Sequence, residues 1–197
     1  MALVVFTGGA RCGKSKAAVE LAKSRESLGS RVTFVAFGDP SAGVERTRLI
    51  ENAKLLRPDT FDTLEAREDP EWISKVPEEN LLLLDCLDGY LDSLVRWHDE
   101  NYEATGDSLR DSGEKSIIRM FGEFLDTISN RSGDTIVVTT EVGYGLTPTY
   151  SSERFFRDLL GLANRKLVDV ADSAYMVVCG RLIDLKQLDT VADWPED

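Results

Sequence analysis

Histidine and cysteine are scarce in this sequence of 197 residues, which contains one histidine and three cysteines. The cysteines Cys12, Cys86 and Cys179 are odd in number and lie far apart, in no spacing that is typical of metal ligands. This pattern favours a reduced, cytoplasmic setting.

Long hydrophobic runs are absent as well. No apolar stretch approaches the roughly 20 residues that a membrane-spanning helix needs. The apolar run at 3–6 has no basic region before it and no small-residue cleavage site after it, so we predict no signal peptide.

Positive charge is in deficit, because 23 lysines and arginines are set against 35 aspartates and glutamates, for a net charge of −12. Such a surface repels phosphodiester backbones and anionic lipids, which argues against nucleic acid and membranes as partners. A local basic pocket for a nucleotide is still compatible with it. With 42% apolar residues, the chain can form one substantial core, and we predict a single domain over residues 1–197.

Short apolar runs alternate with segments of helical periodicity. We expect strands at 3–6, 32–37, 81–84, 136–139 and 174–179, helices at 14–28 and 44–56, and core-facing helical stripes within 87–95, 117–128 and 155–167. This alternation predicts an α/β domain with a mostly parallel sheet and crossover helices. The polar stretch 99–113 is expected to be a mobile surface connection, and the acidic tail from Gln187 to be peripheral.

A phosphate-binding motif follows the first expected strand. The residues that satisfy the pattern G-x-x-x-x-G-K-[ST] are Gly8, Gly9, Ala10, Arg11, Cys12, Gly13, Lys14 and Ser15. Glycines let backbone N–H groups turn toward a phosphate, and the following helix N-terminus adds partial positive charge. We expect Lys14 to reach the β- and γ-phosphates and Ser15 to bind Mg²⁺. The alternative is a chance glycine turn before a helix.

An acidic residue, Asp85, ends the apolar run at 81–84. A carboxylate there is costly to bury unpaired, which favours a role on Mg²⁺, direct or through water. Asp85 could also cap the helix that begins near Leu87, and the two roles can coexist. We therefore predict a nucleoside-triphosphate site in which Lys14 and Asp85 are catalytic and Ser15 and Asp85 hold the metal.

The order of these motifs resembles the adenosylcobinamide kinase/adenosylcobinamide-phosphate guanylyltransferase family of cobalamin biosynthesis. The opening GGARCGKS is similar to the family's G-G-A-R-S-G-K-S. Further matches to the family's patterns are the segment from Arg57-Pro58 through Phe61 and Thr63 to Glu65, the loop from Glu141 to Pro148, and the stretch Arg154 to Asp158 with Gly161, Asn164 and Ala171-Asp172. The matches run in order to about Lys186.

This resemblance implies a RecA-type P-loop NTPase fold with helices on both faces of the sheet, often assembled as a homotrimer. It also implies that ATP or GTP, with Mg²⁺, phosphorylates adenosylcobinamide, and that GMP is then transferred to the product through a guanylylated histidine. The nucleotide contacts that it implies are Ala36, Phe37, Gly38, Lys54, Arg57 and Glu65. Taken without the family, Lys54 and Arg57 could be solvated helix charges and Glu65 a surface acid.

The histidine of the second reaction has no counterpart in this sequence. In the family this histidine lies four residues before the arginine that matches Arg57. The corresponding residue here is Ala53. If the register is counted from Arg48 instead, the corresponding residue is Asn52. No histidine occurs between Met1 and Trp97. His98 is interpreted as a packed or helix-end residue, with relocation of the nucleophile as the alternative. At Thr140 the family usually has asparagine.

Three functions follow from these features. The first is a kinase for adenosylcobinamide whose GMP-transfer step is weakened or lost. The second retains both steps by using another nucleophile or direct attack on GTP. The third is a non-catalytic nucleotide-binding subunit with a regulatory or assembly role.

Arg154 and Arg157 could neutralise the transferred phosphate or pair with Glu153 or Asp158.

Overall fold

The computed structural model describes residues 1–38, 51, 54–101, 108–188 and 190. Its strands form one seven-stranded sheet in the order β3-β2-β4-β5-β1-β6-β7. All neighbouring strands are parallel except β6 and β7, which are antiparallel. The predicted mostly parallel sheet is therefore confirmed. The strands are β1 Leu3–Thr7, β2 Val32–Ala36, β3 Asp62–Glu65, β4 Leu81–Asp85, β5 Thr135–Val138, β6 Ser173–Val178 and β7 Arg181–Asp184.

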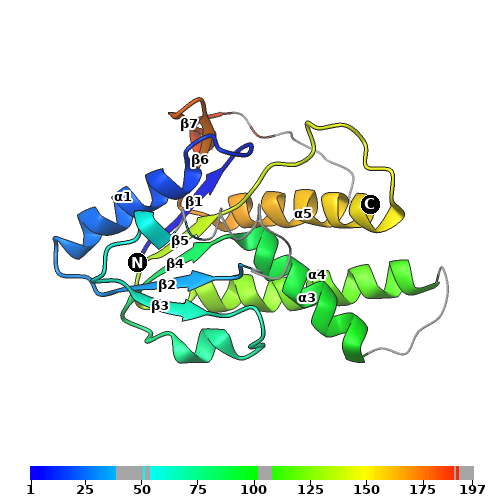
Figure 1. The fold of residues 1–197 in the computed structure, drawn as a ribbon, viewed down its shortest axis with the longest axis horizontal. Coiled ribbons are helices and arrows are strands. Elements are labelled where there is room, and N and C mark those ends of the chain that lie inside the picture. Colours follow the sequence, from blue (N-terminus) through cyan, green and yellow to red (C-terminus); the bar gives the residue numbers. More distant parts are fainter. Residues whose placement is uncertain (39–50, 52–53, 102–107, 189, 191–197) are drawn as a thin grey trace.

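Helices cover both faces of this sheet, as predicted (Figure 1). Helix α1 packs on one face, while α3, α4 and α5 pack together on the other. None of the described helices combines the length and the apolar character that a membrane crossing demands. The helices are α1 Lys14–Glu26, α3 Leu87–Asn101, α4 Ser108–Ser129 and α5 Ser151–Val170, with short 3₁₀ helices η2 Trp72–Lys75 and η3 Leu185–Gln187.

The central strands are those that the apolar runs predict. Every residue of β1, β2 and β5 is buried, because helices lie above and below these strands. The strands β3 and β7 were not predicted. Their side chains are mostly exposed, and they form strands because each pairs with a neighbouring strand, β2 or β6. An edge strand that is extended because of such pairing need not show periodic apolar residues in its sequence.

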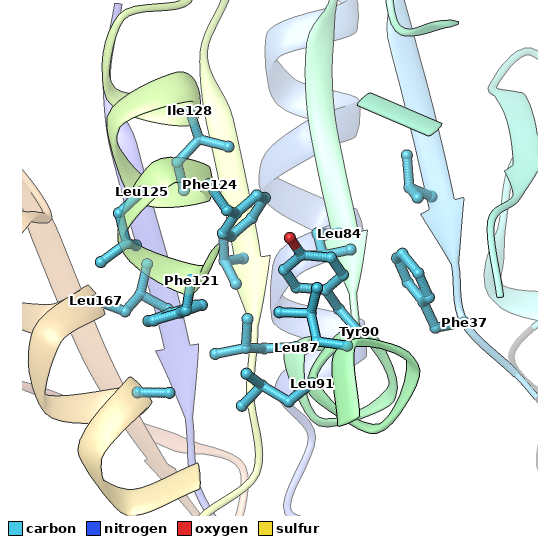
Figure 2. Packing of buried hydrophobic residues seen from close by; sticks show 14 of the residues in the cluster. Phe37, Leu84, Leu87, Tyr90, Leu91, Phe121, Phe124, Leu125, Ile128 and Leu167 are labelled. Carbon is cyan, nitrogen blue, oxygen red and sulfur yellow. The ribbon is translucent and has the colours of Figure 1, made fainter. Parts of the chain in front are cut away.

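An aromatic cluster joins α3 and α4 to the sheet (Figure 2). The ring of Phe37, just past β2, lies 5.4 Å from that of Tyr90 on α3, and Tyr90 lies 4.6 Å from Phe124 on α4. At Gly89 an added Cβ would lie 2.7 Å from the Cβ of Phe37, so a glycine allows α3 to begin this close to β2. This packing holds the first turn of α3 at the carboxyl edge of the sheet.

Two predicted segments need correction or lie outside the description. The connection predicted at 99–113 is wrong at both ends, since α3 continues through Asn101 and α4 begins at Ser108. Apolar periodicity misses such helix ends because they carry few core-facing side chains. Residues 102–107 and most of the helix predicted at 44–56 lie outside the described residues, although residues 51 and 54–56 are helical. So does the tail at 189 and 191–197.

A buried arginine braces the opposite, amino-terminal edge of the sheet. Arg131 is 2% exposed, and its guanidinium donates to the carbonyl oxygens of Pro77 at 2.7 Å and Asn80 at 3.1 Å. We expect Arg131→Met to lower the free energy of unfolding by about 2–4 kcal/mol, because it removes buried hydrogen bonds donated by a charged group. Urea unfolding measures this loss.

The matched control is Arg119→Met, which removes an exposed arginine of α4 that pairs with Glu123. Its loss should stay within about 0.5 kcal/mol. Equal losses in the two variants would show that the buried contacts of Arg131 add nothing.

Candidate nucleotide-binding site

The phosphate-binding motif lies between β1 and α1, in the middle of the sheet. Its backbone takes left-handed φ angles at Gly8 (141°), Arg11 (55°) and Gly13 (110°). A Cβ at Gly8 would lie 2.4 Å from the backbone oxygen of Val177 on β6, so only glycine fits there. The loop between these residues, with Gly9, Ala10 and Cys12, therefore turns back over the N-terminus of α1.

Lys14 is the first residue of α1 and points back under this loop. Its Nζ donates to the carbonyl oxygens of Gly8 at 2.9 Å and Gly9 at 2.8 Å, and the residue is 9% exposed. The first N–H groups of a helix have no intrahelical acceptor. Together with the Lys14 ammonium, those of α1 gather positive charge at one corner, of the kind that suits an anion.

Ser15 and Asp85 meet beside this corner. The Ser15 hydroxyl hydrogen-bonds to the Asp85 carboxylate at the end of β4. Burial raises the pKa of Asp85 above its ordinary 3.8, although the residue keeps some exposed surface. The hydrogen bond from Ser15 and the charges of Arg57 and Lys14 oppose this rise, while the charge of Asp88 adds to it. The pair offers a hydroxyl and a carboxylate, whose hard oxygen atoms are the donor type that Mg²⁺ prefers.

Register brings the end of β2 to the same edge. Ala36 pairs with Asp85 on one side and with Glu65 on the other. Gly38 is half-buried, two residues further on. The side chain of Phe37 is fully buried in the aromatic cluster (Figure 2), so only its backbone is left for a nucleotide. This orientation follows from the alternation of side chains along a strand.

Lys54, Arg57 and Glu65 form one charged group on the β2 side of the site. The Oε1 of Glu65 lies 3.8 Å from the Lys54 ammonium and 4.0 Å from the Arg57 guanidinium. The interpretation of Arg57 as a solvated helix charge is wrong, since its side chain is 9% exposed and lies over the Phe34 ring at 3.8 Å. Burial lowers the pKa of Arg57, against the charges of Glu65 and Asp85. Lys54 and Glu65 are both more than half exposed.

A polar network that the sequence pattern does not reveal lies on the β5 side of the site. Asn164 of α5 pairs with the Thr139 hydroxyl at 2.5 Å and donates to the carbonyl oxygen of Thr140 at 3.0 Å. The Thr140 hydroxyl lies 3.4 Å from Oδ1 of Asp88, in the first turn of α3. The backbone N–H of Glu141 donates to the Gly8 carbonyl at 3.1 Å. The sequence signal for Asp88 was its position just past a buried parallel strand, where ligands bind in such sheets.

The two arginines near the start of α5 have separate roles. Arg154 donates to the carbonyl oxygens of Pro148 at 2.9 Å and Thr149 at 2.6 Å, and so ties the exposed loop after β5 to the helix. Arg157 pairs with Asp158 at 2.8 Å, as one of the two interpretations held. The pairing of Arg154 with Glu153 is not among the described contacts.

The positions that bear on the second reaction are only partly described. Asn52 and Ala53 lie outside the described residues. His98 is in the helical backbone of α3, and its side chain is not described. The described residues therefore test neither the interpretation of His98 as a packed or helix-end residue nor the alternative of a relocated nucleophile.

Solved structures share this fold. One is the subject of "Structural and biochemical analysis of a prototypical ATPase from the type III secretion system of pathogenic bacteria", with a TM-score of 0.54 at 10% identity. The match covers 89% of this chain and 51% of that chain. At this identity the likeness concerns the fold alone, which is of the RecA-type P-loop class predicted from the sequence.

The sequence comparisons reach further. The chain is 25% identical over 191 residues to the "Bifunctional adenosylcobalamin biosynthesis protein CobU" of Escherichia coli (strain K12), covering 93% of this chain and 99% of that protein. It is 27% identical over 187 residues to CobP of Pseudomonas aeruginosa, which carries the same description, with 92% and 96% covered. Residues 4–185 match the family described as Cobinamide kinase / cobinamide phosphate guanyltransferase. The chain therefore belongs to this cobinamide kinase / cobinamide phosphate guanyltransferase family of cobalamin biosynthesis.

Proposed function

We propose that this chain is a nucleoside-triphosphate-dependent kinase that phosphorylates adenosylcobinamide, and that its GMP-transfer step is weakened or lost. The observation that carries the kinase step is the convergence of Lys14 and the hydrogen-bonded pair of Ser15 and Asp85 at one corner. Phosphoryl transfer to an alcohol depends mainly on positioning and neutralisation of charge, which these residues supply.

The residues present fit a magnesium ion. Among the described residues there is no cluster of three or more His, Cys, Asp and Glu side chains that could hold a metal alone. Mg²⁺ is commonly bound through one or two carboxylates and the phosphates of its substrate, so Ser15 and Asp85 would suffice. When bound there, Mg²⁺ neutralises charge on the β- and γ-phosphates.

The chain's own groups then have distinct tasks. Backbone N–H groups of Gly8–Ser15 bind the phosphates, and the Lys14 ammonium turns from the loop carbonyls toward the β- and γ-phosphates. Ala36, Gly38 and the backbone of Phe37 contact the rest of the nucleotide. Arg57 is the best placed of the charged group to meet phosphate, since it is already desolvated and its charge reaches Asp85.

The second reaction lacks a nucleophile where the family resemblance places one. Neither the methyl group of Ala53 nor the carboxamide of Asn52 can attack an α-phosphate usefully. No histidine precedes His98 in the sequence. This composition supports the loss or weakening of GMP transfer.

By the same resemblance we propose that the chain assembles as a homotrimer, which light scattering would measure.

Mass spectrometry of a reaction containing the protein, Mg²⁺, GTP or ATP and adenosylcobinamide tests the proposal. We expect a corrinoid product that gains one phosphate and goes no further. A product that carries a GDP unit would show that GMP transfer survives, and His98→Ala would then test relocation. Bound nucleotide without any modified corrinoid would overturn the kinase in favour of a regulatory or assembly subunit.

A further inference from the structure

We propose that Asp88 is the catalytic base of the kinase step, taking the proton of the acceptor hydroxyl as its oxygen attacks the γ-phosphate. The inference rests on the proposed function and adds to it a residue on the acceptor side of the site. Asp88 is half-buried in the first turn of α3, three residues after Asp85.

The strand order brings Asp88 to the mouth of the phosphate-binding loop. β5 lies between β4 and β1, so residues that follow β4 and β5 lie next to the loop that follows β1. Asp88 comes from the β4 side and accepts from the Thr140 hydroxyl on the β5 side at 3.4 Å. The next residue, Glu141, donates from its backbone to Gly8 at 3.1 Å. One continuous set of contacts thus links Asp88 to the loop.

The two aspartates have different partners, which separates their roles. Asp85 accepts a hydrogen bond from Ser15 and lies in the field of Lys14 and Arg57, on the side where the phosphates and metal would bind. Asp88 has no lysine or arginine within ion-pair distance among the residues that the structure describes. Its described donors are the Thr140 hydroxyl and the Cys86 thiol, both neutral. Asp88 is therefore the one of the two carboxylates that is not committed to the phosphate and metal side of the site.

Arg57 is a buried cation on the β2 side of Asp85, away from the β5 side where Asp88 lies. We expect negative charge of the nucleotide to bind near it. The Arg57 side chain is 9% exposed, and its Nε has no hydrogen-bond acceptor among the described residues. The charges of Arg57 and Asp88 both shift the pKa of Asp85, so Asp85 lies close to both residues. A γ-phosphate between Lys14 and Arg57 would leave the Asp88 side open to the acceptor.

The step balances without a further reactant. The acceptor hydroxyl oxygen of adenosylcobinamide forms a bond to the γ-phosphorus, and the bond from that phosphorus to the β–γ bridging oxygen breaks. The nucleoside diphosphate leaves with the electron pair of the broken bond. The hydroxyl proton passes to Asp88, whose orientation the Thr140 hydroxyl helps to set. Because phosphoryl transfer is loose, the contribution of the base should lie near the low end for such groups.

The test compares Asp88→Asn, which keeps the shape and the acceptor oxygen, with the wild type. We expect kcat for adenosylcobinamide phosphorylation to fall about 10²-fold, with the nucleotide Kd and the melting temperature unchanged. Thr140→Val should lower kcat less, because it only loosens the carboxylate. The matched control is Asp92→Asn, one turn further along α3, where the carboxylate pairs with Arg67 at the surface. Its kcat should equal that of the wild type.

The other outcomes separate the two proposals. If the wild type phosphorylates the corrinoid and Asp88→Asn stays within about threefold of it, Asp88 is not the base and the kinase stands. A variant that loses nucleotide binding or folding in step with kcat also overturns the inference, since Asp88 would then act in binding or structure. If the wild type binds nucleotide but makes no phosphorylated corrinoid, the proposed function fails and the base with it.

Discussion

The Lys14→Met variant is expected to fold normally and to lose corrinoid phosphorylation by at least about 10³-fold. The side chain is 9% exposed and donates to the carbonyl oxygens of Gly8 and Gly9, so its ammonium already lies inside the loop that would hold the phosphates. Methionine has similar length and no charge. The variant therefore removes the cation that would meet negative charge on the β- and γ-phosphates. Steady-state kinetics measures the loss of phosphorylation, and nucleotide titration measures the affinity for the nucleotide.

Lys16→Met is the matched control, because Lys16 is exposed two residues further along α1. It removes the same charge near the same helix N-terminus and should leave turnover within about twofold of the wild type. Equal losses in both variants would mean that general positive charge, and not the Lys14 contact, supports the reaction. Retained turnover in Lys14→Met would contradict the assignment of this corner to the phosphates.

The Asp85→Asn variant is expected to lose turnover by about 10³-fold and at the same time to become more stable by about 1 kcal/mol. Asparagine keeps an acceptor for Ser15 but carries no charge for a metal. Burial raises the pKa of Asp85, which means that the charged carboxylate is less favourable in the folded protein than in the unfolded chain. Removing that charge removes its cost. Urea unfolding without Mg²⁺ or nucleotide measures the gain.

The pH dependence of this gain follows from the direction of the shift. The carboxyl titrates near 3.8 in the unfolded chain and at higher pH in the folded protein. Between these values the folded protein binds the extra proton, so this group lowers stability as the pH rises. The advantage of Asp85→Asn is therefore complete above the folded pKa and disappears as the pH falls toward 3.8. The control is Asp126→Asn, at an exposed site on α4, which should leave the free energy of unfolding within about 0.5 kcal/mol of the wild type. A variant less stable than the wild type at neutral pH would contradict the argument.

Much of the fold could be predicted because its signals are local. The buried strands are apolar runs bounded by turn residues, and their parallel arrangement follows from the helical segments between them. The edge strands β3 and β7 escaped prediction because the partner strand, and not the composition, makes them extended. The ends of α3 and α4 escaped it because polar residues there carry no periodic signal.

In the candidate site, too, the residues with a local sequence signal were predicted and the contacts without one were not. The loop at Gly8–Ser15 and the acid Asp85 were found from the sequence, since each lies within or directly beside one apolar strand. The burial of Arg57 over Phe34 could not be found in this way, because a charged residue in a polar segment is usually solvated. The bonds of Arg154 to loop carbonyls were equally hidden, because sequence spacing gives only neighbours on one helix.

The sequence alone was enough to identify the glycine-rich pattern of a phosphate-binding loop, an acid after an apolar run, an α/β alternation and the lack of a histidine before His98. Each of these is a property of consecutive residues, or of composition, and needs no knowledge of distant contacts. The contact of Asp88 with Thr140, 52 residues away, and the burial of Phe37 in the core could be known only from the folded chain. The reason is that the strand order β2-β4-β5-β1 sets which carboxyl ends are neighbours, and packing of the whole sheet selects that order.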